Sequence, residues 1–392
     1  MKSLGCNVCQ MNGRISHIAE NQDRRKPSNK CIGDDPIDRI REGLEILVDD
    51  DGSTLKIISQ DFAGGGESVS IDVGRLTNKN GSIVCIAKTI KIMQEGDALS
   101  SIHQVDSNEH MIADIMKQGE ISKHLCLPFT HYDRNKAYAR SNVSQRLMSS
   151  SSKFKFITIL SEFINGHDLT KLMKYHPNRL TVNLIKNIIK SIWDALKNIH
   201  SNRIVNSDIK PSNIMIGDNG EIKLIDFGRA SYISETSPKD MDEKRNEDKK
   251  ILKRIFSTPI YISAAIMKGD IRDIVDRNCL LSFLKLSDIW SYGMVIYEMI
   301  ALRPYFNEYI KEHPVSIINS LMNHIEKHVS AGNSLEIDPV VSNMMISVDP
   351  KILEICKKCL TFYPISIAGS EQEYINYANN VINEIDHLVS SL

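Results

Sequence analysis

One continuous stretch, residues 204–228, constrains the fold of this chain more than any other part. It reads Ile-Val-Asn-Ser-Asp-Ile-Lys-Pro-Ser-Asn-Ile-Met-Ile-Gly-Asp-Asn-Gly-Glu-Ile-Lys-Leu-Ile-Asp-Phe-Gly. The Gly-Asp-Asn-Gly run inside it separates two short apolar segments, which is a strong signal for a tight hairpin. Such a hairpin folds Asp226 back beside Asp208 and Asn213. The stretch therefore predicts a compact unit that holds two carboxylates, an amide and the ammonium of Lys210.

These four side chains suit phosphoryl transfer better than other chemistries. A phosphoryl group in transit carries diffuse negative charge, so its site needs oxygen ligands for a divalent cation and a positive charge nearby. It also needs a carboxylate that receives the proton of the acceptor hydroxyl. The plainer alternative is a polar turn between two strands. The joint presence of all four groups at this spacing favours the chemical interpretation.

The stretch resembles the catalytic loop and the Asp-Phe-Gly segment of eukaryotic-type protein kinases, in which four residues separate the catalytic Asp from an Asn. The same spacing separates Asp208 from Asn213. The resemblance implies that Asp208 is the base, that Lys210 steadies the γ-phosphate of ATP, and that Asn213 and Asp226 hold Mg²⁺, with Mn²⁺ as the alternative ion. A Lys two residues after the catalytic Asp indicates a serine/threonine kinase rather than a tyrosine kinase.

Upstream segments resemble the nucleotide-binding parts of the same family. Gly64, Gly65 and Gly66 are expected to form a loop over the phosphates, because glycines let backbone amides approach phosphate oxygens closely. Lys88 ends the Cys-Ile-Ala-Lys run that resembles the family's third strand, and its ammonium is expected to hold the α- and β-phosphates. Glu109 begins a predicted helix over residues 109–116 and is expected to pair with this Lys. Asp114 is the rival for that pairing.

A hinge is expected after the apolar strand that begins near Phe156. The backbone groups of Glu162 and Ile164 are expected to meet the adenine edge, and Ser161 falls at the position that controls access behind the adenine. Residues 138–153 are polar and end in four serines, which indicates a disordered insert before this strand.

Two later segments extend the resemblance. Residues 257–265 resemble the end of an activation segment, in which Thr258 is expected to face the catalytic Asp and Lys. Residues 287–299 resemble a family helix whose buried Asp, here Asp288, hydrogen-bonds the catalytic-loop backbone. Residues 239–250 lie between the Asp-Phe-Gly segment and residues 257–265. They carry mixed charges and are interpreted as a solvated run.

Four positions depart from the family pattern. Asn206 and Ser207 replace the His and Arg that precede the catalytic Asp, while Ala265 and Ile367 replace a Glu and an Arg that form one buried pair in the family. The loss of both partners avoids an uncompensated buried charge. Without the Arg, activity is expected not to depend on activation-segment phosphorylation. Asn206 is expected to weaken the packing under Phe227, so that either an activating protein partner or the N-terminal extension would hold the active arrangement.

Composition excludes some functions. The chain has 392 residues, 42% apolar and 25% charged, with a net charge of −1, which argues against nucleic acid as the main ligand. No membrane span or cleaved leader is expected. Eight scattered cysteines indicate reduced thiols and a cytoplasmic location, or the host cytosol if the chain is a pathogen effector. Cys6 and Cys9 have the spacing of half a zinc site, but free thiols are the preferred interpretation.

The sequence thus predicts an α+β, two-lobed protein-kinase-like fold, with a small antiparallel sheet and one main helix in the first lobe and a mostly helical second lobe. The expected boundaries are a flexible extension at 1–53, a first lobe at 54–165 and a second lobe at 166–392. The expected activity is ATP- and Mg²⁺-dependent phosphorylation of Ser and Thr in protein substrates. The alternatives are a pseudokinase that acts as a nucleotide-binding or scaffolding module, and a kinase of a lipid or small metabolite.

Overall fold

The chain divides into two compact units, which are described separately. The computed structural model describes residues 45–48, 52–59, 69–93, 108–133, 154–236, 240–255, 258–267, 271, 274–309, 314–328 and 330–392. Unit 1 comprises residues 1–100 and 130–163, and unit 2 comprises residues 101–129 and 164–392. Residues 101–129, which were expected in the first lobe, therefore group with unit 2.

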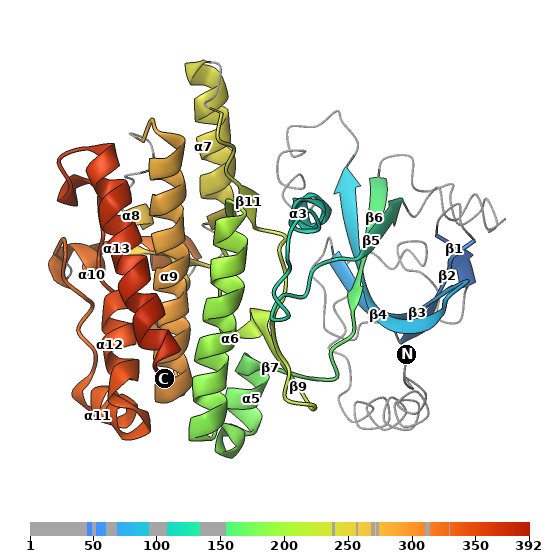
Figure 1. The fold of residues 1–392 in the computed structure, drawn as a ribbon, viewed down its shortest axis with the longest axis horizontal. Coiled ribbons are helices and arrows are strands. Elements are labelled where there is room, and N and C mark those ends of the chain that lie inside the picture. Colours follow the sequence, from blue (N-terminus) through green and yellow to red (C-terminus); the bar gives the residue numbers. More distant parts are fainter. Residues whose placement is uncertain are drawn as a thin grey trace. The chain divides into compact units, whose positions relative to one another are not determined.

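Unit 1 is built on a six-stranded antiparallel sheet with the order β1-β2-β3-β4-β6-β5, and Figure 1 shows that the sheet is strongly curled. The strands are β1 (Glu45–Leu47), β2 (Thr54–Ser59), β3 (Val69–Asn78), β4 (Gly81–Met93), β5 (Thr130–Asp133) and β6 (Phe154–Glu162). The β3–β4 connection is a tight turn at Asn80-Gly81, where the glycine has a φ of 131°. The sheet begins earlier than expected, because β1 lies within the region predicted to be a flexible extension. Burial of Ile46, opposite Leu55, explains why this short strand joins the sheet.

Strand β4 shows the two-residue alternation of a sheet with one face on the core. Cys85, Ala87 and Thr89 are buried, whereas Val84, Ile86 and Lys88 on the opposite face are half-buried. Lys88 lies in register with Ile71 on β3 and Ile159 on β6. The strand thus points the Lys88 side chain away from the buried face of unit 1.

Unit 2 is mostly helical. Its described helices are α3 (Asn108–Met116), α5 (Leu169–Tyr175), α6 (Val182–Ser201), α7 (Met241–Ile255), α8 (Ala264–Met267), α9 (Arg277–Ala301), α10 (Pro314–His328), α11 (Pro339–Val348), α12 (Pro350–Cys359) and α13 (Glu371–Ser390). Its short strands are β7 (Gly166–Asp168), β8 (Ile204–Val205), β9 (Ile214–Gly217), β10 (Ile222–Leu224) and β11 (Ser231–Tyr232). The helix predicted over residues 109–116 is confirmed as α3.

Helix α9 is the central helix of unit 2. Figure 1 shows α6, α9 and α13 running side by side, and α12 also packs on α9. Within the described residues, α9 is the one helix long and apolar enough to cross a membrane, but 94% of its apolar window is buried inside the protein. Asp276 begins the helix by accepting hydrogen bonds from the backbone N–H groups of Asn278 and Cys279. This burial is that of a core helix.

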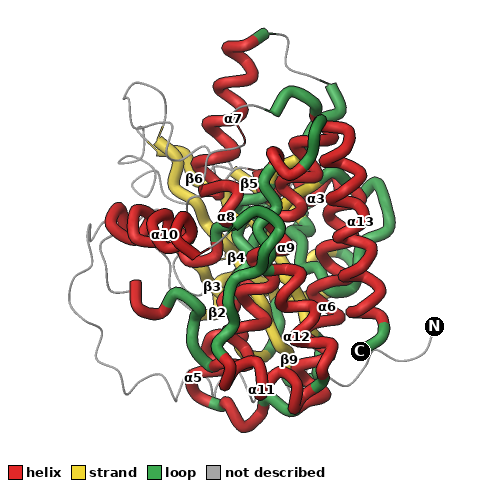
Figure 2. The backbone as a smooth tube through the Cα atoms, turned by 90° about the vertical axis from the view of Figure 1, so that its left-hand side faces the viewer, coloured by secondary structure: helices red, strands yellow, loops and turns green. Residues whose placement is uncertain are grey.

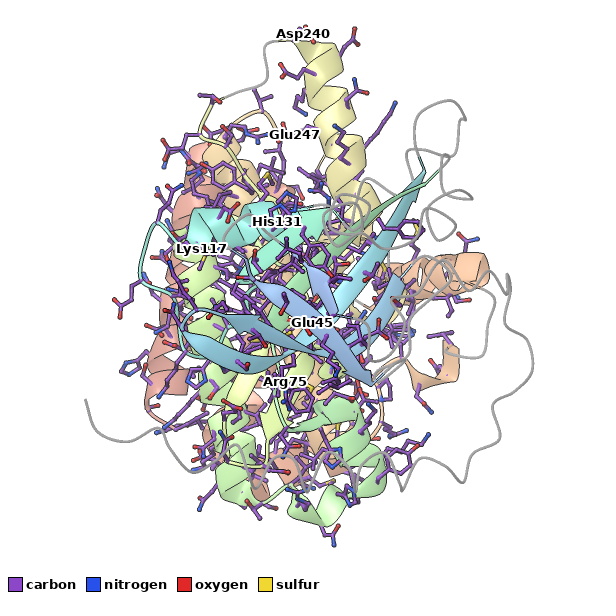
Figure 3. All side chains as sticks on the ribbon, turned by 90° about the vertical axis from the view of Figure 1, so that its right-hand side faces the viewer. Glu45, Arg75, Lys117, His131, Asp240 and Glu247 are labelled. Carbon is purple, nitrogen blue, oxygen red and sulfur yellow. The ribbon has the colours of Figure 1, made fainter. Side chains whose placement is uncertain are left out.

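Most of the charged run predicted to be solvated lies on helix α7, and several of its side chains, such as Glu243 and Lys250, are exposed. Its charged sequence is helical, and Figures 1 and 2 both show it projecting from the other helices of unit 2. Figure 3 labels Asp240 at its outer end and Glu247 nearer the helical body. The helix is anchored on one side, because Ile251 and Ile255 are buried in the core of the unit. Two apolar residues one turn apart were too weak a signal to stand out among the charges.

The cysteines of α12 are core residues. Cys356 and Cys359 are buried, and all five cysteines in the described ranges are free thiols. Cys6 and Cys9, the candidate half of a zinc site, lie outside the described residues, as does the insert predicted at 138–153.

Candidate active site

The carboxylate of Asp208 is the centre of a dense hydrogen-bond network in unit 2. One oxygen, Oδ2, accepts from Lys210 Nζ at 2.8 Å and from Asn213 Nδ2 at 3.1 Å. The other, Oδ1, accepts from the Thr258 hydroxyl at 2.8 Å, and Lys210 Nζ lies 3.2 Å from the same hydroxyl. The prediction that Thr258 faces Asp208 and Lys210 is confirmed. Asp208 is only 8% exposed, so a proton acceptor is held in one orientation next to a fixed positive charge.

The loop that carries Asp208 is held from below by Asp288 on α9. The Asp288 carboxylate accepts from the backbone N–H of Asn206 at 2.8 Å and of Ser207 at 2.9 Å, which confirms its predicted supporting role. Its Oδ2 also forms a buried hydrogen bond with His200 Nε2 at 2.9 Å. No motif in the sequence pointed to this pairing, whose partners are 88 residues apart. Ser207 has a φ of 63°, a strained conformation that these bonds to a buried carboxylate hold in place.

The predicted hairpin is present and delivers Asp226 to the same place. Strands β9 and β10 pair antiparallel, and the turn between them closes through Gly220, whose φ is 85°. After β10, the backbone N–H of Ile225 donates to the Asn213 carbonyl at 2.9 Å. The next residue, Asp226, therefore begins beside the catalytic loop. Its Oδ1 accepts from the Gly228 N–H at 3.2 Å, and its φ is 65°.

Asn206 joins the two acidic segments. Its Oδ1 accepts from the backbone N–H of Asp208 at 3.0 Å, and its Nδ2 lies 3.5 Å from the Asp226 carbonyl. The side chain is fully buried, and Phe227 beside it is also fully buried. The expected weakening of the packing by Asn206 is therefore offset by hydrogen bonds that tie the catalytic loop to the Asp-Phe-Gly segment.

The amide of Asn213 has an orientation that suits a cation. Its Nδ2 donates to the Asp208 carbonyl at 2.9 Å and to the Asp208 carboxylate, both of which only accept hydrogen bonds. The nitrogen must therefore face Asp208, which turns the amide oxygen the other way. An amide oxygen and the carboxylate of Asp226 are the oxygen donors that Mg²⁺ prefers, so these residues fit the predicted metal.

A second buried acid lies behind the segment that follows Thr258. The Tyr261 hydroxyl donates to Glu298 on α9 at 2.6 Å, and Ser291 Oγ donates to the Tyr261 carbonyl at 2.8 Å. Burial raises the pKa of Glu298, and the hydrogen bond from Tyr261 opposes this rise. Burial, and then the neighbouring Glu298 charge, raises the pKa of Tyr261 far above its usual range. The pair fixes the end of the activation segment to the central helix.

The remaining predicted residues fall in both units. Lys88, Ser161 and Glu162 lie on the sheet of unit 1, with Ser161 opposite Ile86 and Glu162 opposite Cys85. In unit 2, Glu109 is buried on α3, the rival Asp114 is exposed, and Ile164 is buried. Pairing of Lys88 with Glu109 joins different units and stays a prediction. Gly64, Gly65 and Gly66 lie outside the described residues.

Ala265 and Ile367 stand where the family has a Glu and an Arg that form an ion pair, and both pack as apolar residues. Ala265 is buried in α8, and Ile367 packs at the edge of the core of unit 2. Neither Ala265 nor Ile367 therefore places a charge in the core.

Comparison with known proteins agrees with this geometry. The family described as the protein kinase domain matches residues 135–372, which is more than half of the chain. This chain belongs to the protein kinase family. Its antiparallel sheet in unit 1 and mostly helical unit 2 are those expected for the two-lobed kinase fold.

Individual relatives of this kinase chain are serine/threonine kinases. A probable serine/threonine-protein kinase of Dictyostelium discoideum is 28% identical over 71% of the chain and 53% of its own length. The serine/threonine-protein kinase TIO of Arabidopsis thaliana is 27% identical over 54% of the chain and 14% of its own length. The probable serine/threonine-protein kinase nek2 of D. discoideum is 28% identical over 55% and 46%. The chain thus spans about half or less of the length of these relatives.

Proposed function

We propose that this chain is a protein serine/threonine kinase that transfers the γ-phosphoryl group of ATP to Ser and Thr hydroxyls in the presence of Mg²⁺. The observation that carries the proposal is the network around Asp208, in which a buried carboxylate is held by Lys210, Asn213 and Thr258. Bound Mg²⁺-ATP supplies the phosphoryl group and neutralises part of its charge. The names of the relatives support protein as the substrate class.

The residues of unit 2 have distinct roles in this proposal. Asp208 accepts the proton of the substrate hydroxyl. That hydroxyl either replaces the Thr258 hydroxyl at Asp208 Oδ1 or binds beside it. Lys210 supplies positive charge next to the transferred group. Asn213 and Asp226 hold Mg²⁺ through their side-chain oxygens. Lys88, assisted by Glu109, orients the phosphates, and the backbone of Glu162 and Ile164 receives the adenine next to Ser161.

Nothing observed in the described residues favours the alternative of a pseudokinase. The positions that motivate that alternative are Asn206, Ala265 and Val69, the last of which stands where the kinase glycine loop has its third glycine. Asn206 preserves a connection between the catalytic loop and Asp226, Ala265 is accommodated in the core, and Val69 pairs with Ile90 in the sheet. The relatives named above are kinases, so a scaffolding role alone has no support.

The experiment that tests the proposal is phosphate transfer to a mixed library of Ser- and Thr-containing peptides. Radiolabelled ATP is supplied with Mg²⁺, with Mn²⁺, and with a chelator, and a metabolite and lipid pool is offered in parallel. The proposal expects metal-dependent label on peptides. Label found only on lipids or metabolites would assign the chain to the other kinase class, and the absence of any label would overturn the proposal.

A further inference from the structure

An ion pair joins the projecting helix α7 to the central helix α9. Arg277, the first residue of α9, donates from both terminal nitrogens to Glu247 of α7, at 3.0 and 2.6 Å. Its Nε donates to the Ser234 carbonyl at 3.2 Å. The Arg277 side chain is 6% exposed and that of Glu247 is 32% exposed. Bidentate pairs of this kind are both stronger and more specific in geometry than single contacts.

A second arginine binds the same stretch of backbone from the side of the catalytic loop. Arg203 donates from Nε to the Ile233 carbonyl at 2.7 Å and from Nη2 to the Ser234 carbonyl at 3.3 Å. In return, the Ile233 N–H donates to the Arg203 carbonyl at 2.9 Å. Arg203 directly precedes β8, the strand that leads into Asp208, and β8 pairs with β11. The start of the activation segment is therefore bound to the strand that leads into Asp208.

The other end of α7 lies against the catalytic loop itself. Ile255, the last residue of the helix, is buried and lines a small cavity together with Ser207, Asp208 and Thr258. Helix α9, at the other side of the ion pair, holds the same loop through Asp288. A path thus runs from the cavity that Ile255 and Asp208 both line, along α7 and through the Glu247–Arg277 pair to α9, which binds the same loop through Asp288.

Basic groups that hold an activation segment ordinarily need an anion to bind. Ser207 stands where a catalytic-loop arginine is expected, and the structure uses a different arginine with a carboxylate from the chain itself. A carboxylate paired in a bidentate way with a guanidinium makes the same kind of charge-assisted contact that a phosphate makes. The anion here is the Glu247 carboxylate, which needs no modification of the protein to be present.

We infer that the Glu247–Arg277 pair is a built-in clasp that positions the activation segment, and with it Thr258 and Asp208, without phosphorylation. This inference rests on the proposed kinase function. Glu247 and Arg277 are positioning residues, because neither contacts Asp208. The plainer reading is an ion pair that only stabilises the fold, and the two readings predict different kinetics.

The test is a double-mutant cycle in the full chain with Glu247→Gln, Arg277→Gln and the double variant, all treated with phosphatase. Glu243→Gln is the matched control, because it removes one exposed acid from the same helix one turn earlier. Breaking the pair is expected to lower kcat for the peptide library about tenfold, with the KM for ATP unchanged. The double variant is expected to be no worse than Arg277→Gln alone. Amide hydrogen exchange over residues 229–236 is expected to rise in the same three variants.

The outcomes separate this inference from the proposed function. If the wild type transfers phosphate and Glu247→Gln matches Glu243→Gln in both kcat and exchange, the clasp is wrong and the function stands. If Glu247→Gln, Arg277→Gln and the double variant all lose thermal stability but keep the wild-type kcat, the clasp is also wrong, because the pair then only stabilises the fold. If the wild type transfers no phosphate, the function is wrong, and the exchange of residues 229–236 alone decides whether Glu247 holds the segment.

Discussion

At the scale of single residues, Asn206 shows how one substitution changes its meaning once its contacts are known. From sequence, an amide in place of a family histidine only weakens an apolar stack. In the fold, its Oδ1 takes the Asp208 N–H and its Nδ2 approaches the Asp226 carbonyl. A buried amide has an acceptor and two donors, so it can connect two segments that an apolar residue could only touch. The residue type was readable from the sequence, but the partners were not.

Tyr261→Phe gives a residue-scale prediction with a defined pH dependence. The change leaves the buried Glu298 carboxylate without the hydroxyl that now donates to it, which is expected to cost about 1–3 kcal/mol of unfolding free energy. Loss of this donor raises the Glu298 pKa further, so the folded state binds more protons than the unfolded state. Stability of the variant is therefore expected to fall as pH rises. Denaturant unfolding at pH 5 and pH 8 measures both effects.

The matched control for this prediction is Tyr261→Phe in a Glu298→Gln background. With no carboxyl to titrate, the difference between pH 5 and pH 8 is expected to shrink to that of Glu298→Gln alone. If the single variant lost equal stability at both pH values, the coupling between the hydroxyl and a charged Glu298 would be refuted.

At the scale of elements, the packing of α7 could not be predicted from its sequence pattern. Its sequence carries charges around most of its circumference, which predicts a solvated run. Its fixed position comes from Ile251 and Ile255 together with the Glu247–Arg277 pair, whose partners are thirty residues apart. By contrast, the β9–β10 hairpin was predictable, because its turn chemistry is local. A turn can be predicted from neighbouring residues, whereas the partners of a long-range ion pair cannot be read from the sequence.

Gly166→Ala tests the packing of β7 against β9. A Cβ at residue 166 would lie 2.0 Å from the Ile216 carbonyl oxygen, so the two strands must move apart. The expected loss is about 1–3 kcal/mol of unfolding free energy, measured by thermal or urea unfolding. Gly119→Ala is the control, because its Cβ would meet its nearest neighbour, Asn202 Oδ1, at an ordinary 3.7 Å. Equal stability of the two variants would contradict the close approach.

At the scale of the whole molecule, the family and the two-lobed fold class were predictable from a few short motifs, because their residues carry chemistry that tolerates little change in spacing. The division of the chain was less predictable. Strand β1 begins before the expected boundary at residue 54, and residues 101–129 group with the helical unit. Boundaries depend on which surfaces are buried together, and an isolated buried residue such as Ile46 gives no periodic signal.

Phosphatase treatment gives a prediction for the complete protein. Ser207 leaves no catalytic-loop arginine to gather an activation-segment phosphate, and the segment is held by Arg203 and Arg277 through carbonyls and a carboxylate. Turnover of the dephosphorylated protein is therefore expected to equal that of the untreated protein. Mass spectrometry confirms removal of phosphate, and circular dichroism checks the fold. Loss of turnover with an intact fold would show that a phosphate is needed.

The central claim is that Asp208, with Lys210, Asn213 and Asp226, forms a phosphoryl-transfer site. Its most direct test is radiolabelled phosphate transfer from ATP to the peptide library by the wild type and by Asp208→Asn, at equal concentration and with unfolding curves recorded for both. The account predicts metal-dependent transfer by the wild type and a kcat about 10²–10⁴-fold lower for the variant. Equal transfer by the two proteins, or no transfer by the folded wild type, would contradict it.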